Sequence, residues 1–286
     1  MMEIFSLKPK ATRFNAIKML IIYEIKKNIN KRLVIALVIL SLLVAVGTVA
    51  LINYILSEPT IPSFVKSIYG KYKWYIIMSM PGFFIALIGI AIGGGLFSSE
   101  YEDKSSYVIY TKPVDRLDIF VGKVLGGYTV IVAITLFFGV LAIALSYIVF
   151  RDIEGIWAAP IILLATIYSQ ILYYSLTYMF SQLIKKTTIA TIIGVAIIII
   201  VPFIDSVLAG ISHTKGLEYL KYIVYISPTW AAGLPSYIAN DLLKDLQLTS
   251  SELSDPYLAS IVILIYFILT SAITVYNLLK SDLVID

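Results

Sequence analysis

The densest group of charged side chains in this sequence lies in one stretch, residues 98–123, which joins two long apolar runs. Its acidic and basic members are Glu100, Glu102, Asp103, Asp115, Asp118, Lys104, Lys112, Arg116 and Lys123. The chain has no cysteine and one histidine, His213, which excludes thiolate chemistry and multi-histidine metal sites and makes Ser-His-Asp chemistry improbable. The mixed charges therefore indicate either a docking surface for another protein or a solvated connector.

Apolar and aromatic residues are interleaved with these charges. Residues 105–111 alternate polar side chains with apolar ones that include Tyr107 and Tyr110, and a short helix here could present apolar knobs to a partner's groove. Pro113 is unfavourable in a helix interior but suits a first turn. It therefore predicts a new helix that runs from Val114 into the next apolar run.

Polar residues inside the apolar runs form a second group. Four of them share one helical face and could either line a translocation path or make interhelical hydrogen bonds: Gln170, Tyr174, Thr177 and Ser181. Asp205 lies about one span's length beyond Lys186, which predicts a solvated residue at the outer end of its helix. Two GxxxG pairs, Gly89 with Gly93 and Gly122 with Gly126, permit close approach of helices.

The elements that carry these residues must be membrane spans. The chain is 59% hydrophobic and 14% charged, with a mean hydropathy of +0.92, which places it in the integral membrane class. Six apolar runs are long enough to cross a bilayer, and they do not alternate as barrel strands do. The sequence predicts an all-α membrane protein with spans at Leu33–Leu56, Trp74–Phe97, Ile119–Phe150, Ile156–Leu183, Thr188–Leu208 and Tyr257–Leu279.

The basic residues predict the orientation of these spans. Both termini lie on one side of the membrane together with the 98–123 stretch, and 15 of the 22 lysines and arginines fall on that side. Because cytoplasmic loops are enriched in lysine and arginine, we expect a multi-pass protein of the cell membrane with both termini in the cytoplasm. All three tryptophans, Trp74, Trp157 and Trp230, fall at predicted outer ends, where interfacial rings are common.

Two segments outside the spans have helical character. Residues 12–31 place Ile17, Leu20, Ile21 and Ile25 at helical spacing, which predicts an interfacial amphipathic helix; the alternative is a solvated basic tail. The first apolar run begins only near Leu33, so no cleavable signal peptide is expected. Residues 209–255 predict two short helices broken at Ser227-Pro228, either re-entrant or capping the surface.

The charged stretch also resembles the cytoplasmic signature of ABC-2 type transporter permeases. The matching residues are Glu100, Glu102, Ser105, Lys112, Pro113, Arg116, Gly122 and Lys123. The sequence departs from that pattern at Lys104, where the family usually has Gly, and at Ser105, where Thr is usual. The resemblance implies one permease domain over 1–286, with a coupling loop at 98–118 that docks on an ATPase. The expected coupling residues are Glu100, Glu102, Tyr107, Tyr110, Pro113 and Arg116.

The resemblance further implies a subunit that uses ATP hydrolysed elsewhere to export a substrate. Neither Gly-Lys pair, at Gly70-Lys71 or Gly122-Lys123, belongs to a GxxxxGK phosphate loop, so ATP and Mg would be bound by a partner ATPase subunit and no cofactor by this chain. The other expected partners are membrane lipid and a second permease subunit, the same or similar; no nucleic acid is expected. The alternative is a secondary transporter or channel that ATP does not drive, and a membrane-embedded enzyme ranks third.

The predicted topology can be tested by labelling. We expect single cysteines introduced at Lys71 and Lys215 to react with a membrane-impermeant maleimide in intact cells, because both positions lie outside. A cysteine at Lys185 should react only after the cells are opened. Labelling at Lys185 with silence at Lys215 would invert the orientation.

Overall fold

Six helical stretches of the chain are long and apolar enough to cross a membrane. The computed structural model describes residues 13–104, 115–151, 153–212, 217, 219–243 and 254–280, and these contain no strand. The stretches are α2 (Arg32–Ser57), α4 with α5 (Lys73–Gly94), α8 with η1 (Arg116–Phe150), η2 with α9 (Ile156–Ile184), α10 (Thr187–Ser212) and α14 (Pro256–Lys280). The predicted all-α membrane fold is confirmed.

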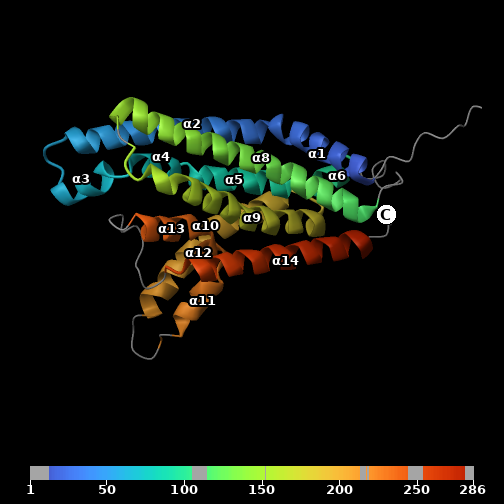
Figure 1. Ribbon diagram of the computed structural model, residues 1–286. Helices are drawn as coiled ribbons and strands as arrows, with labels where there is room; N and C mark the ends of the chain where they lie inside the picture. The colour runs from blue at the N-terminus through green and yellow to red at the C-terminus, as the bar shows by residue number, and fades with distance from the viewer. Residues whose placement is uncertain are drawn as a thin grey trace, which may run out of the picture.

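The spans lie roughly along one direction, so the bundle has two ends (Figure 1). At one end, called the α6 end, lie α1 (Arg13–Ile29), α6 (Ser98–Glu102), the start of α8 and the end of α14. At the other, called the α13 end, lie α3 (Ser63–Gly70) and α13 (Leu234–Leu242). The residues at 98–104 and 115–123 that the sequence singled out therefore belong to the α6 end.

The second span is broken, whereas the sequence predicted one helix over 74–97. It consists of α4 (Lys73–Ser79) and α5 (Gly82–Gly94), and a turn at residues 95–97 separates α5 from α6. Pro81 lies at the break, and proline has no backbone N–H to continue the helical ladder. The second span therefore consists of two helices that meet at residues 80–81.

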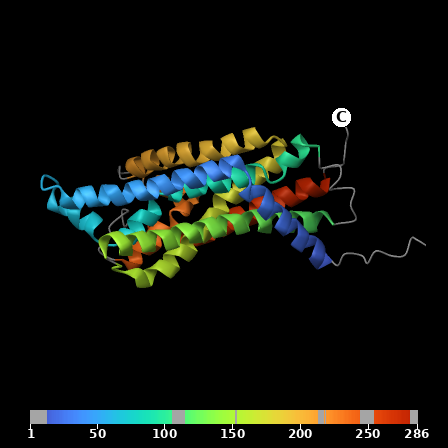
Figure 2. The same ribbon diagram turned by 90° about the horizontal axis from the view of Figure 1, so that it is seen from above.

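The predicted amino-terminal helix exists as α1, and it crosses α8 closely (Figure 2). A Cβ atom added at Gly126 would lie 2.8 Å from Glu24 Cβ and 2.9 Å from Ile21 O, and one at Gly122 would lie 2.7 Å from Leu20 Cβ. This GxxxG pair is thus the groove that receives α1. In the other pair, Gly93 closely approaches a backbone carbonyl, while Gly89 has only ordinary contacts.

Among the described residues between α10 and the last span there are three short helices, whereas the sequence predicted two. They are α11 (Leu220–Ile226), α12 (Pro228–Ala232) and α13. The chain breaks at Ser227, as expected, and the Ser227 hydroxyl accepts a hydrogen bond from Thr229 N at the start of α12. The extra break follows Gly233, after which Pro235 occupies the first turn of α13.

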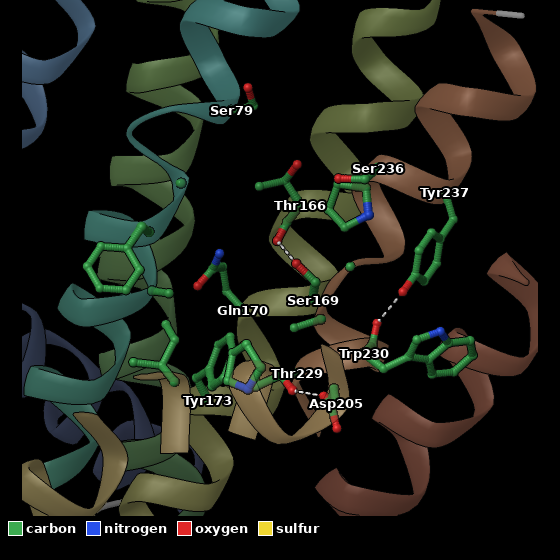
Figure 3. A pocket seen from close by; sticks show the side chains of 18 of the residues that line it. Ser79, Thr166, Ser169, Gln170, Tyr173, Asp205, Thr229, Trp230, Ser236 and Tyr237 are labelled. Carbon is green, nitrogen blue, oxygen red and sulfur yellow. Dashed lines mark hydrogen bonds between the residues drawn. The ribbon is translucent and has the colours of Figure 1, made fainter. Parts of the chain in front are cut away.

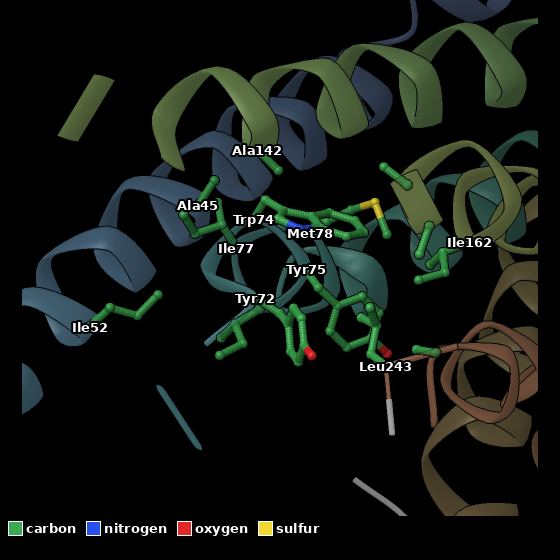
Figure 4. Packing of buried hydrophobic residues seen from close by; sticks show 14 residues of the cluster. Ala45, Ile52, Tyr72, Trp74, Tyr75, Ile77, Met78, Ala142, Ile162 and Leu243 are labelled. Atoms are coloured by element: carbon green, nitrogen blue, oxygen red, sulfur yellow. The ribbon is translucent and has the colours of Figure 1, made fainter. Parts of the chain in front are cut away.

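Buried aromatic side chains hold the α13 end together (Figure 4). Trp74 packs with Tyr75 and Ile77 of α4, and its Nε1 donates to Glu154 O at 2.8 Å. Trp157 is 61% exposed, whereas Trp74 is 1% exposed and Trp230 is 6% exposed. Both rings are buried because neighbouring helices, not lipid, cover them.

The α1–α8 contact predicts a specific stability defect. Gly126→Val should lower the free energy of unfolding by about 1–3 kcal/mol, because the added atoms overlap the α1 backbone. Gly47→Val in α2 is the matched control, since a Cβ there meets nothing within 4 Å. Thermal unfolding of the purified variants, followed by size-exclusion chromatography, measures the difference. Equal melting temperatures for the two variants would contradict this packing.

Candidate functional site

Polar side chains are gathered in two regions of the bundle interior. One is a cluster of buried charges at the α6 end, and the other is a pocket near the α13 end. Each region brings together residues that lie far apart in the sequence.

Lys123 is the centre of the charge cluster. Its side chain is 0% exposed, and its Nζ forms ion pairs with Glu100 of α6 and, at 3.6 Å, with Glu24 of α1. Nζ also donates to Leu96 O at 2.8 Å and lies 5.2 Å from the centre of the Phe97 ring. A buried ammonium requires such compensation, and here it joins α1, α6 and α8.

Glu24 places a carboxylate on the buried face of α1. Asn28 Nδ2 donates to Glu24 O at 2.9 Å and to its Oε2 at 3.2 Å, and Lys27 Nζ lies 3.3 Å from its Oε1. Just beyond α1, Lys31 donates to Ala91 O, so the same region also contacts α5. Burial, reinforced by the charge of Lys27, lowers the pKa of Lys31 to about 8.

The first part of the expected coupling loop, residues 98–104, contacts the interior of the bundle. Glu100 is 2% exposed and lies against Lys123. Glu102 Oε1 accepts a hydrogen bond from Thr187 N at the start of α10, at 3.0 Å. The backbone N–H of Ser98 donates to Ser181 Oγ at 2.9 Å. Helix α6 is thus fastened to α8, α9 and α10.

The second part of the loop is tied to the last span. Asp115 precedes α8, which begins at Arg116, two residues later than the start predicted at Val114. The Arg116 guanidinium donates to Leu278 O at 2.8 Å and to Leu279 O at 2.9 Å. Tyr107, Tyr110 and Pro113 lie outside the described residues.

Three of the four polar residues expected on one face of the fourth span are engaged in packing. Tyr174 donates to Val124 O at 3.0 Å, Thr177 donates to Tyr173 O, and Ser181 accepts from Phe97 N at 3.1 Å. All three are buried between helices. The contacts of Tyr174 and Ser181 favour interhelical bonding, whereas Thr177 bonds within its own helix, and the translocation-path alternative has its best support at Gln170.

Gln170 lines a pocket of about 600 Å³ near the α13 end (Figure 3). The walls come from the α4–α5 break, the first half of α9, the second half of α10 and the helices α12 and α13. Gln170 is 6% exposed, and its Oε1 has no hydrogen-bond partner among the described residues. The sequence analysis placed Gln170 on a polar face but gave no sign of this pocket.

Asp205 lines the same pocket, so the expectation that it is a freely solvated residue is wrong. It is half-buried, and its Oδ2 accepts from Ser227 Oγ at 2.6 Å and from the Thr229 hydroxyl. The sequence placed Asp205 at the end of a span correctly but could not show that α11 and α12 fold back against it.

A bundle of six candidate spans with interior polar sites defines a multi-pass membrane protein. The chain belongs to the ABC-2 family of transporter proteins, whose family model matches residues 19–283. It is therefore the permease of an ABC transporter, as the charged stretch and the helix layout indicated. None of the curated proteins is significantly similar to it.

The charge cluster predicts a large loss of stability in one variant. Lys123→Met should destabilise the fold by roughly 3–5 kcal/mol, because it removes the cation paired with the buried Glu100 and leaves the buried Glu24 with Lys27 alone. The control Lys186→Met removes an exposed lysine and should change the free energy of unfolding by about 0.5 kcal/mol at most. Adding Glu100→Gln to Lys123→Met should recover part of the loss, and its failure to do so in thermal unfolding would contradict the pairing.

Proposed function

We propose that the chain couples ATP hydrolysis by a separate ATPase subunit to export of a substrate across the cell membrane. The α6 end would face the cytoplasm, because most of the basic residues flank it. The observation that carries the proposal is the burial of Lys123 between Glu24 and Glu100. These ion pairs support transmission of force from the coupling loop, because the loop follows α6, which carries Glu100, and precedes α8, which carries Lys123.

A force applied to this loop would be transmitted to several spans through contacts at the α6 end. Glu102 contacts the start of α10, Ser98 contacts α9, and Arg116 contacts the end of α14. Buried helix contacts are stiff, so a displaced loop would move these helices together rather than bend alone. In this proposal, Glu100 positions the loop from inside, while Tyr107 and Tyr110 contact the ATPase.

The working unit would be a pair of permease subunits, either two copies of this chain or this chain with a similar one. Two ATPase subunits would bind ATP and Mg below them, and surrounding lipid would cover the apolar outer faces of the spans. Closure of the ATPases on ATP would press on the two coupling loops. The spans would then expose the shared interface to opposite sides of the membrane in turn.

One observation favours a second candidate, a secondary transporter driven by an ion gradient. Asp205 contributes a half-buried carboxylate to a pocket, and carboxylates near transport pathways can couple ions to cargo. Transport by reconstituted vesicles separates the two functions. Dependence on added ATPase subunit and ATP supports the proposal, whereas transport driven by a proton or sodium gradient alone supports the second candidate.

The docking role of the loop can be tested at its tyrosines. Tyr107→Ala with Tyr110→Ala should leave membrane insertion intact but release the ATPase subunit and uncouple its turnover, because apolar anchors dominate interfaces. The matched control is Tyr219→Ala with Tyr222→Ala, which removes two exposed tyrosines near α11. Pull-down of the ATPase and substrate-stimulated ATP turnover are the measurements.

Full partner retention and coupled turnover in the Tyr107/Tyr110 variant would show that this loop is not the dock. Helix α1, around Ile17–Ile25, would then become the better candidate. Loss of the partner in both tyrosine variants would indicate a folding defect rather than a lost contact, so the comparison between them decides.

A further inference from the structure

We infer that the pocket near the α13 end binds an organic ammonium ion that carries an apolar or aromatic body. Binding itself requires only this chain; the further step, that such a cation is the cargo, rests on the proposed export function. The inference stands on three features of the pocket: its charge, an unsatisfied buried acceptor and its aromatic walls.

The charge of the pocket is negative. Among its described lining residues, Asp205 alone bears a charge, and no lysine or arginine faces it. Asp205 Oδ2 accepts hydrogen bonds from Ser227 and Thr229, while Oδ1 accepts none from the described residues. A carboxylate held in place by two hydroxyls, with one oxygen still available, is suited to a cationic donor and repels an anion.

A second acceptor points to a ligand with N–H groups. Gln170 is buried, and its Oε1 has no partner in the described part of the chain although it lines the pocket with Asp205 (Figure 3). Leaving a buried acceptor unpaired is unfavourable. A primary or secondary ammonium has the N–H donors that such an acceptor needs, whereas Asp205 is the one carboxylate among the described lining residues, and Ca²⁺ and Mg²⁺ favour carboxylate-rich sites.

Aromatic rings form much of the remaining wall. Tyr75, Phe83, Tyr173, Trp230 and Tyr237 all line the pocket. Two other rings contact Trp230: its ring centroid lies 5.0 Å from that of Tyr225 and 5.5 Å from that of Tyr237. Aromatic faces attract organic cations. They also provide an apolar surface against which the body of an organic cation can pack, and a hydrated metal ion has no such body. The volume of about 600 Å³ is in the range of pockets that hold drug-sized molecules.

Dansylcadaverine tests the inference, because it joins a primary ammonium to an apolar fluorophore. Its binding to the purified chain in lipid nanodiscs is followed by fluorescence anisotropy, with empty nanodiscs subtracted and no ATPase subunit or nucleotide present. The N-acetylated probe keeps the fluorophore and loses the charge, so we expect it to bind about tenfold more weakly or worse.

Two variants locate the site. Asp205→Asn should weaken dansylcadaverine binding by about tenfold or more, and Gln170→Met by several-fold, while neither should affect the acetylated probe. Asp241→Asn is the matched control, because Asp241 is exposed on α13 and does not line the pocket. If Asp205→Asn fails to fold, Gln170→Met decides alone.

Equal binding of the two probes, or unchanged binding in both pocket variants, would overturn the inference. A chain that couples to its ATPase but does not bind the ammonium probe would contradict this inference alone. A chain that binds the probe through Asp205 and Gln170, yet transports without any ATPase, would support the site and contradict the proposed function. The two conclusions therefore fail separately.

Discussion

An ammonium group that leaves water must be paired inside the protein, or the folded state cannot tolerate it. Lys123 meets this requirement with Glu24 on α1 and Glu100 on α6, and much of the α6 end follows from that pairing. The ion pair with Glu24 fixes α1 across the glycine groove of α8, and the ion pair with Glu100 fixes the first turn of the charged loop. A hydrophobic residue at this position would remove both ion pairs, and the contacts among α1, α6 and α8 would then depend on packing.

Helix α9 connects the charge cluster to the pocket. Its Ser181 accepts hydrogen bonds from the backbone of α6, while Gln170, about three turns away, lines the pocket. A rigid helix of this kind moves as a unit, so a shift of the charged loop would change the position of the pocket wall. Residues on both sides of the break in the second span also line the pocket.

The sequence predicted the six spans to within a few residues, because long apolar runs have few alternatives in a membrane. It could also have indicated the burial of Glu24, which lies three and four residues after Ile21 and Leu20 and so shares their helical face. The pocket could not be predicted in this way. It depends on the break at Pro81, which the proline itself indicates, and on α11 and α12 folding back toward Asp205, which is a tertiary arrangement that no local pattern records.

The contact between Arg116 and the last turn of α14 bears on how the protein is made. Its partners, Leu278 and Leu279, lie 162 and 163 residues further along the chain. Because synthesis proceeds from the amino terminus, Arg116 is in the membrane long before these carbonyls exist. The start of the third span therefore forms this contact only after the three following spans have been inserted. Truncated products that lack the final helix would lose these two hydrogen bonds, and with them this link between the first turn of α8 and the end of α14.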